Sequence, residues 1–387
     1  MTPSRSIVIA GAGIGGLTAA LALAAKGFRV TILEKAARLE EAGAGLQLSP
    51  NASRVLIGLG LAARLTPHAV APETLSIMTA RSGGAVIRLS LAASARPDAP
   101  YWLVHRADLQ GALLGAVDSN PDITLRLASP VDDIDITTDG IRIGDVAAGA
   151  LIGADGAWSS VRQKIFPDIQ PQFSGLIAWR GTCAAADLPQ DVRPSGVQLW
   201  MGPKAHLVVY PMSSGERVNM VAIVSGAALP PGWSEPGMHD EIGRYFAQAG
   251  WPEAARILIG AADSWRRWPL FTMPDGGAWN AGRIALLGDA AHAMLPFAAQ
   301  GAGMAIEDAA VLAQCLGASS NRDIAAALAH YAALRRPRVT RVQRTARQSG
   351  QIYHLRGPMA LARDLSMRLL GAGRLQARQD WIYNWTA

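Results

Sequence analysis

The chain has little cysteine and little charge, and each shortage excludes a class of protein. Only two cysteines occur among 387 residues, Cys183 and Cys315, and their separation argues against both a disulfide framework and a metal site. Charged residues make up 17% of the chain and hydrophobic residues 50%, which excludes a disordered chain and indicates a well-folded soluble one. The length is sufficient for more than one domain with a large core.

Hydrophobic runs long enough to cross a bilayer are lacking too. The apolar stretch 7–25 could pass for a signal peptide, but it is interrupted by the glycines of the motif described below. No small-residue cleavage site follows this stretch, and a helix within it would be too short to span a membrane. We therefore expect a cytoplasmic protein without an integral membrane segment.

Positive charge is concentrated near one end of the chain. Residues 321–387 carry 12 arginines, no lysine and 3 acids, a net charge of +9 against +6 for the whole chain. Five of these arginines recur at every third position: Arg335, Arg338, Arg341, Arg344 and Arg347. Nucleic-acid binding is one interpretation of this stripe, but no nucleic-acid motif accompanies it, and we expect no such partner. We favour a solvated helix face that also packs over acidic neighbours.

The strongest motif is a glycine-rich turn at residues 11–16, GAGIGG. It follows a strand-like run at 7–10, opens a helix expected at 17–25, and precedes a second strand-like run that ends on Glu34. This is the order of a nucleotide-binding βαβ unit, in which Gly11 allows the tight turn, Gly13 admits a pyrophosphate, and Gly16 lets helix and strand pack closely. The helix N-terminus offers N–H groups to the anion, and Glu34 can accept hydrogen bonds from a ribose.

Two further strand ends carry acids. Asp155 follows the run 150–154, and Asp289 follows the run 284–288. Because ligands of an open parallel sheet lie beyond the carboxyl ends of its strands, we expect the loops of Glu34, Asp155 and Asp289 to converge on one crevice. The sequence holds no second nucleotide fingerprint, which indicates one firmly held dinucleotide and only transient binding of any other.

The order of the expected elements indicates an α/β protein. A Rossmann-like domain is interrupted by a mainly antiparallel β-sheet domain and is followed by a helical C-terminal tail. Strand-like runs of the inserted sheet lie at 74–80, 85–91, 175–183, 196–201, 205–210 and 217–224, and further strands are expected at 131–137 and 141–143. We predict a discontinuous nucleotide-binding domain of residues 1–72, 98–170 and 270–345, a substrate-binding sheet of 73–97 and 171–269, and a helical segment of 346–387.

Over nearly its whole length the chain resembles the single-component, FAD-dependent aromatic hydroxylases of the para-hydroxybenzoate hydroxylase type. Besides the glycine turn and Glu34-Lys35, the matching segments are 43–51 (GAGLQLSPN), 105–109 (HRADL), 153–156 (GADG) with 160–162 (SVR), 288–292 (GDAAH), and Pro296 with 300–304 (QGAGM). Within that family, its motifs are most similar to those of salicylate, 3-hydroxybenzoate and 6-hydroxynicotinate monooxygenases.

The resemblance implies FAD as the cofactor and suggests roles for the matching residues. It places Glu34, with Lys35 beside it, at the adenosine ribose, Arg106 along the FAD, and Asp289 at the ribityl or pyrophosphate region. Asp155 and Arg162 belong to the motif that such enzymes use for FAD and for the incoming NADH or NADPH. Further FAD contacts are implied at Pro296, Gly301, Gly303 and Met304.

One position departs from the family pattern, because many relatives carry asparagine where Gly303 stands. The departure leaves the contact with the flavin pyrimidine to backbone N–H groups. The residues support such a contact, because a helix expected at 304–316 would begin here with about half a positive charge at its N-terminus. That charge would stabilise a reduced, anionic flavin.

Hydroxylation by a flavin hydroperoxide formed at the C4a carbon requires an electron-rich aromatic substrate, and removal of a phenol proton provides one. In the strand 205–210, period-two alternation puts His206, Val208 and Tyr210 on one face. His206 is the candidate general base and Tyr210 the candidate hydrogen-bonding partner of the substrate. Gln300 is expected to border flavin and substrate. A purely structural His206 stays open, although this His-x-x-x-Tyr-Pro arrangement is similar to that of the hydroxylases.

We therefore expect an FAD-dependent monooxygenase that uses NADH or NADPH and O₂ to hydroxylate a small aromatic, a phenol or a phenolic or heteroaromatic carboxylate. One alternative is a flavin oxidoreductase of the same fold that inserts no oxygen, and another is a non-catalytic FAD-binding regulator. The remaining histidines show no clustering that would indicate a metal. The residues leave open the identity of the aromatic, the ring position, the choice of nicotinamide, and whether the protein forms a homodimer.

Overall fold

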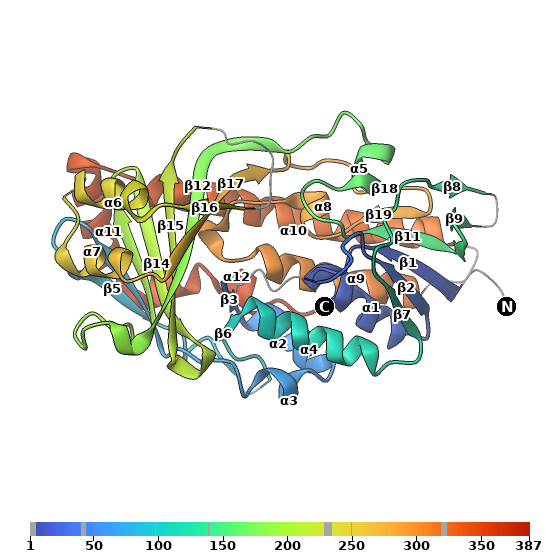
Figure 1. Ribbon diagram of the computed structural model, residues 1–387, viewed down its shortest axis with the longest axis horizontal. Helices are drawn as coiled ribbons and strands as arrows, with labels where there is room; N and C mark the ends of the chain where they lie inside the picture. Colours follow the sequence, from blue (N-terminus) through green and yellow to red (C-terminus); the bar gives the residue numbers. More distant parts are fainter. Residues whose placement is uncertain are drawn as a thin grey trace.

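The computed structural model describes residues 5–39, 44–96, 98–137, 140–227, 234–248, 250–318 and 323–387. The molecule is elongated, with one β-sheet toward each end and the long helix α10 (Ile324–Tyr353) lying between them (Figure 1). The predicted α/β fold with an inserted, mainly antiparallel sheet is confirmed. Within the described ranges, no helix combines the length and apolar character needed to cross a bilayer.

The first sheet has six strands in the order β18-β19-β11-β1-β2-β7. Its pairs are parallel except for the edge pair of β18 and β19. The strands are β1 (Ser6–Ala10), β2 (Arg29–Leu33), β7 (Ile123–Arg126), β11 (Ala150–Gly153), β18 (Asn280–Ala281) and β19 (Ile284–Leu286). Strands β1, β11 and β19 are apolar and almost wholly buried, as expected for a sheet covered on both faces.

Helices cover this sheet and form the larger hydrophobic core together with its strands. They are α1 (Ile14–Ala24), α4 (Arg106–Asp118), α9 (Gly301–Ala318) and the first part of α10. Residues 16–24 of α1 are buried without exception, which explains why its sequence lacks a polar face. The helix begins three residues before the predicted start at residue 17, directly after Gly13.

The second sheet has eight strands in the order β16-β17-β12-β15-β14-β13-β4-β5. Its strands are β4 (Thr74–Thr79), β5 (Ala85–Ser90), β12 (Gln172–Ala184), β13 (Val197–Gly202), β14 (Ala205–Met212), β15 (Arg217–Ser225), β16 (Glu235–Gly237) and β17 (Ser264–Thr272). The hairpin β4–β5 joins the sheet through a parallel pairing of β4 with β13. Segments more than 100 residues apart in sequence therefore share this sheet.

One face of the second sheet packs against α6 (His239–Gln248) and α7 (Glu253–Gly260), two helices that the sequence analysis does not anticipate. Alternation along β14 sorts its side chains: Leu207 and Val209 enter this core, whereas His206, Val208 and Tyr210 face a cavity on the opposite side. The predicted facing of the strand is therefore observed.

Short elements complete the chain. They are β3 (Gly45–Leu48), α2 (Pro50–Gly58), α3 (Ala62–Leu65), β6 (Trp102–His105), β8 (Asp135–Ile136), β9 (Ile141–Ile143), β10 (Val146–Ala148), α5 (Ser160–Ile165), α8 (Asp289–His292), α11 (Gly357–Ala377), α12 (Asp380–Tyr383) and the 3₁₀ turns η2 (Ala185–Asp187), η3 (Ser213–Gly215) and η4 (Pro296–Ala298). The strand expected at 131–137 is wrong in extent, because only the exposed β8 forms there, paired with β9 at the edge of a small sheet.

The turn between β1 and α1 shows why glycine is required there. Gly11 has a φ of +102°, and a Cβ on Gly11 would lie 2.6 Å from the carbonyl oxygen of Ala154. A Cβ on Gly16 would lie 2.0 Å from the carbonyl oxygen of Gly11. The close approach of α1 to the turn therefore depends on the absence of both side chains.

We predict that Gly16→Ala lowers the free energy of unfolding by about 2 kcal/mol or more, because the backbone oxygen that the new methyl meets cannot move without opening the turn. Denaturant unfolding of the purified protein measures the loss. Gly111→Ala is the matched control: it lies on an exposed part of α4 with no atom within 4 Å of the added Cβ. That variant should be neutral or stabilised by about 0.5–1 kcal/mol. Equal stability of the two variants would contradict the account of the turn.

Candidate active site

A single cavity of about 1380 Å³ runs from the glycine turn to the second sheet. The three acids that end strands, Glu34, Asp155 and Asp289, all line it, as do Gly11 and Gly13. Its far wall is formed by the inward faces of β12, β14 and β15 together with the ends of α10, α11 and α12. The loops of three distant chain segments thus meet around one space, as their positions after parallel strands predict.

The end of this space at the glycine turn has the shape expected for a dinucleotide. A Cβ on Gly13 would meet no atom within 4 Å, so the backbone is open to the cavity where a pyrophosphate would approach. Glu34 accepts hydrogen bonds from the backbone N–H groups of Ala12 (2.7 Å) and Ala36 (2.9 Å), which fixes its carboxylate at the cavity edge. Lys35 lies beside it on the cavity wall, whereas Gly16 is buried behind the turn. These residues fit an FAD.

Arg106 and Asp289 approach each other across the cavity. Burial lowers the pKa of the Arg106 guanidinium, and the charge of Asp289 opposes that shift. Both side chains line the cavity, so a cation and an anion are available to the middle part of a bound dinucleotide. Gly43, the first residue of the motif 43–51, lies outside the described residues.

Asp155 and Arg162 have different surroundings, although one motif contains both. The Asp155 carboxylate accepts hydrogen bonds from the hydroxyls of Ser159 and Ser160 and still lines the cavity. Arg162 is 1% exposed and does not line it. Its guanidinium donates to the carbonyl oxygens of Ala157, Ile169 and Ala290, and so ties the loop after β11 to α8. In this structure Arg162 supports the two loops from behind.

The start of α9 divides its predicted residues in the same way. Pro296 and Gly301 line the cavity, whereas Gln300, Gly303 and Met304 are buried beneath the helix end. Gln300 donates to the hydroxyl of Ser49 (2.7 Å) and accepts from the amide of Asn51 (3.1 Å). Gln300 thus holds the helix start in place and does not itself border the open space.

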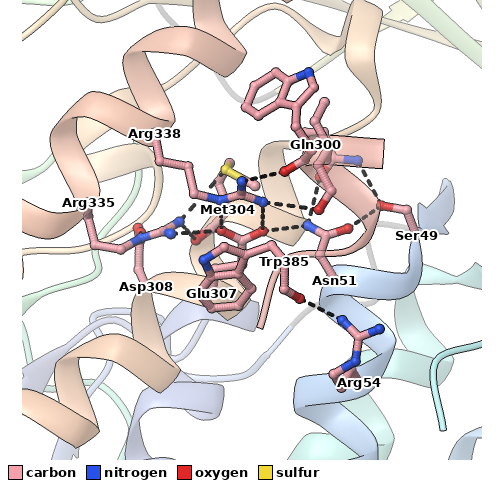
Figure 2. Close-up of polar contacts among 12 residues, drawn as sticks. Ser49, Asn51, Arg54, Gln300, Met304, Glu307, Asp308, Arg335, Arg338 and Trp385 are labelled. Atoms are coloured by element: carbon pink, nitrogen blue, oxygen red, sulfur yellow. Dashed lines mark hydrogen bonds and ion pairs between the residues drawn. The ribbon is translucent and has the colours of Figure 1, made fainter. Parts of the chain in front are cut away.

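A buried charge cluster, defined here as Glu307, Asp308, Arg335 and Arg338, lies under this helix end (Figure 2). Glu307 accepts hydrogen bonds from Arg335 (2.7 Å), from Arg338 (2.6 Å) and from the amide of Asn51 (2.6 Å). Asp308 accepts from Arg335 (2.6 Å) and is paired with His292 (2.6 Å). Burial raises the pKa of the Asp308 carboxyl, but the charges of His292 and Arg335 outweigh burial and hold it below 3.8.

The cluster also corrects the prediction for the arginine stripe. Arg335 is 1% exposed and Arg338 is largely buried, so a solvated face is the wrong description of this part of α10. Arg341 stacks on Trp381 at 3.8 Å, and only Arg344 and Arg347 form the more exposed pairs, both with Asp275. The expected acidic neighbours are present: Glu307 and Asp308 beside the buried arginines, and Asp275 beside the exposed ones. The stripe thus joins α10 to α9 and to the C-terminal segment.

The end of the cavity at the second sheet is walled by His206, Tyr210 and five residues that no site prediction from the sequence included. His206 Nδ1 lies 2.9 Å from Nε2 of His354, and burial, together with His354, lowers the His206 pKa well below 6.5. Burial raises the pKa of Tyr210, against the opposing effects of Arg180 and Asn219, so Tyr210 stays a neutral donor. The missed wall residues are Gln47, Tyr101, Arg180, Tyr353 and Tyr383.

A sequence signal existed for only one of these. Arg180 shares a face of β12 with Ala178, while Trp179 between them enters the core against α6 and α7. Period-two alternation of the predicted strand 175–183 places Arg180 on the face opposite to Trp179, and a tryptophan entering the core leaves that face to the cavity. The tyrosines come from segments whose meeting no local pattern indicates: Tyr101 donates to Gln47 (2.7 Å) and makes an edge contact with Tyr383.

We predict that Glu307→Gln lowers the free energy of unfolding by about 3–5 kcal/mol, because it leaves a buried Arg338 without its carboxylate. Chemical denaturation is again the measurement. Asp275→Asn, which removes the exposed pairs on the same helix, should cost no more than about 1 kcal/mol. A Glu307 variant as stable as the Asp275 variant would show that the cluster does not hold α9 to α10.

Comparison with known sequences matches a family model described as an FAD binding domain over residues 4–346. The chain is 38% identical to the 3-amino-4-hydroxybenzoate 2-monooxygenase of Streptomyces platensis, with 98% of this chain and 96% of that protein covered. It is 34% identical to the 3-hydroxybenzoate 6-hydroxylase of Klebsiella oxytoca, with 98% and 96% covered.

Solved structures agree with this. HpxO of Klebsiella pneumoniae, complexed with FAD and uric acid, superposes with a TM-score of 0.83 at 26% identity, covering 96% of this chain and 94% of that one. A salicylate hydroxylase substrate complex gives a TM-score of 0.82 at 27% identity, covering 99% and 96%. We call the glycine turn and Glu34, which line the cavity, the nucleotide cradle. With this cradle and the similarity along its whole length, the chain belongs to the single-component FAD-dependent aromatic hydroxylases, a family of monooxygenases.

Proposed function

We propose that this monooxygenase hydroxylates a small phenol that carries a carboxylate, with NADH or NADPH as the reductant and O₂ as the oxygen source. The observation that carries the proposal is that one cavity joins the nucleotide cradle to a wall holding a histidine, a tyrosine and an arginine, His206, Tyr210 and Arg180. A base, a neutral donor and a cation are the groups that a phenolic acid would require.

The surroundings of Arg180 are the reason for proposing a carboxylate on the substrate. It lies on the cavity wall beneath the ring of Trp268, 5.5 Å from the ring centroid, and burial lowers its pKa. None of the ion pairs among the described residues involves Arg180. A desolvated guanidinium of this kind favours a planar anion as its ligand. The relatives named for hydroxybenzoates and salicylate fit such a substrate.

For the cofactor, we propose that Gly11, Gly13 and Glu34 hold the adenosine and pyrophosphate end of FAD, with Arg106 and Asp289 along its middle. The backbone N–H groups at the start of α9 would lie against the flavin, and Pro296 and Gly301 would shape that contact. When bound, FAD supplies the chemistry of oxygen activation. Gly303 and Met304 support this helix end from beneath, and Gln300 fixes it through Ser49 and Asn51.

His206 removes the phenol proton in this proposal. Since Nδ1 is engaged by His354, Nε2 is the nitrogen left to meet a substrate in the cavity. Its lowered pKa keeps the imidazole neutral in the neutral range, so Nε2 is unprotonated and available to a phenol proton. Tyr210, held neutral by burial, donates a hydrogen bond to the substrate.

The proposed function predicts that 3-hydroxybenzoate or another hydroxybenzoate stimulates NAD(P)H oxidation by the FAD-loaded enzyme more than unsubstituted phenol does. Product formed under ¹⁸O₂ should carry one labelled oxygen, identified by mass. A panel of phenolic acids, hydroxypyridines and their carboxylate-free analogues makes the comparison. NAD(P)H consumption that yields only hydrogen peroxide with every member would contradict the proposal and favour an oxidoreductase that inserts no oxygen.

For the base, we predict that His206→Asn keeps FAD but loses about 10²–10⁴-fold in hydroxylation rate near neutrality. The loss should be greatest at low pH, because the variant depends on a phenol whose own pKa is about 10, as in tyrosine. At high pH the substrate ionises without help, and the two enzymes should converge. The measurement is the hydroxylation rate from pH 6 to about 9.5; an unchanged rate across that range would remove His206 from the mechanism.

A further inference from the structure

His206 has a partner on a distant part of the chain, and together they form a pair that we call the imidazole pair, His206 and His354. His354 directly follows α10 as its C-cap, and its Nε2 lies 2.9 Å from Nδ1 of His206 on β14. The ring centroids are 5.1 Å apart; Phe297 contacts both imidazoles, and Tyr353 contacts His206. His206 is 1% exposed, whereas His354 is only partly buried.

The two imidazoles therefore differ in their access to solvent. His206 reaches the cavity and lies on its wall, while His354 does not line the cavity. A proton that stays on His206 leaves a cation on a buried side chain, and a path to solvent would remove that charge. A hydrogen-bonded second imidazole provides such a path, because each ring accepts a proton at one nitrogen and releases another from the opposite nitrogen.

From this geometry, and resting on the proposed role of His206, we infer that His354 is its positioning residue and the next carrier of the substrate proton toward solvent. The substrate O–H bond breaks as its proton joins Nε2 of His206. The Nδ1–H of His206 then passes to Nε2 of His354, and the Nδ1–H of His354 passes to water. No net oxidation occurs, and the phenolate keeps the electron pair. The reverse sequence restores the starting tautomers when the product is protonated.

The groups around the imidazole pair favour passing a proton on over holding it as an imidazolium. Burial lowers the pKa of His354 to about 4, and both burial and His354 lower that of His206. Tyr353 on α10 has a pKa raised by burial and stays neutral, as does Tyr210 on the same strand as His206. From α11, Arg363 donates to the carbonyl oxygens of Ile352 and Tyr353 and is paired with Asp364. The carboxylate among these neighbours, Asp364, is neutralised by its pair with Arg363 and is not left to trap an imidazolium.

The test follows the proton itself. FAD-loaded enzyme is mixed with 3-hydroxybenzoate, or with the chromophoric phenol 4-nitrophenol, in weak buffer containing a pH indicator. Wild type should form bound phenolate and release a proton to solvent together. His354→Gln keeps a hydrogen-bonding group near His206 but cannot relay a proton, so release should slow by about 10-fold or more, and kcat for hydroxylation should fall with little change in KM. The fall should deepen toward low pH.

Two further variants separate a relay from a structural contact. In His354→Ala, free imidazole added to the solution should restore both proton release and kcat. His330→Gln, an exposed histidine on the same helix, should behave as wild type. Unchanged proton release and pH profile in His354→Gln would overturn the relay, as would a folded His354→Ala enzyme that imidazole does not rescue. Phenol binding to wild type without any proton release would overturn it as well.

The outcomes also keep this inference distinct from the proposed function. If wild type forms ¹⁸O-labelled product and the His354 variants form it equally fast at every pH, the function stands and the relay fails. If wild type releases a proton on binding 4-nitrophenol through His354 but oxygenates no member of the phenol panel, the relay stands and the proposed function fails. If no phenol binds, both fail, because the pair then has no proton to carry.

Discussion

The arrangement of the whole molecule depends on the ion pairs between Glu307 and the two arginines of α10. They fasten α9, which begins at the cavity, to α10, a helix of 30 residues and about 45 Å that ends at the cavity wall beside the second sheet. Tyr331 near the first end of α10 donates to Leu286 in the parallel sheet, and His354 at the other end meets β14. One buried charge cluster thus fixes the start of α9 at the cavity relative to the wall that the second sheet provides.

In the second sheet, the alternation of side chains along each strand decides which residues reach the cavity. The strands of this sheet carry apolar side chains against two covering helices on one face and a mixed set on the other. A slip of one residue in β14 would bury Leu207 and Val209 in the cavity and carry His206 into the apolar core. The register of the sheet is therefore enforced by hydrophobic burial, and the orientation of the polar groups follows from it without further interactions.

The sequence allowed the local parts of the site to be predicted, and the limits have a physical cause. The glycine turn, Glu34, Asp155 and Asp289 follow from the geometry of parallel strands, so neighbouring residues suffice to place them. The motifs predict direct ligand contacts for Arg162 and Gln300, but both side chains are buried and neither lines the cavity. A motif does not tell which side chains face a ligand and which hold the loop in place. His354 lies 148 residues from His206 and has no pattern of its own, so only the folded chain brings it into view.

The packing beneath the start of α9 makes two positions interdependent. A Cβ at Gly303 would lie 2.8 Å from Oε1 of Gln300 and 3.5 Å from the amide nitrogen of Asn51. Gln300 cannot swing aside freely, because Ser49 and Asn51 both bind its amide. A side chain could thus enter position 303 without strain only alongside a compensating change at 300. Evolution or engineering of this helix start therefore proceeds through coupled substitutions. The effects of single and double replacements on stability will not add.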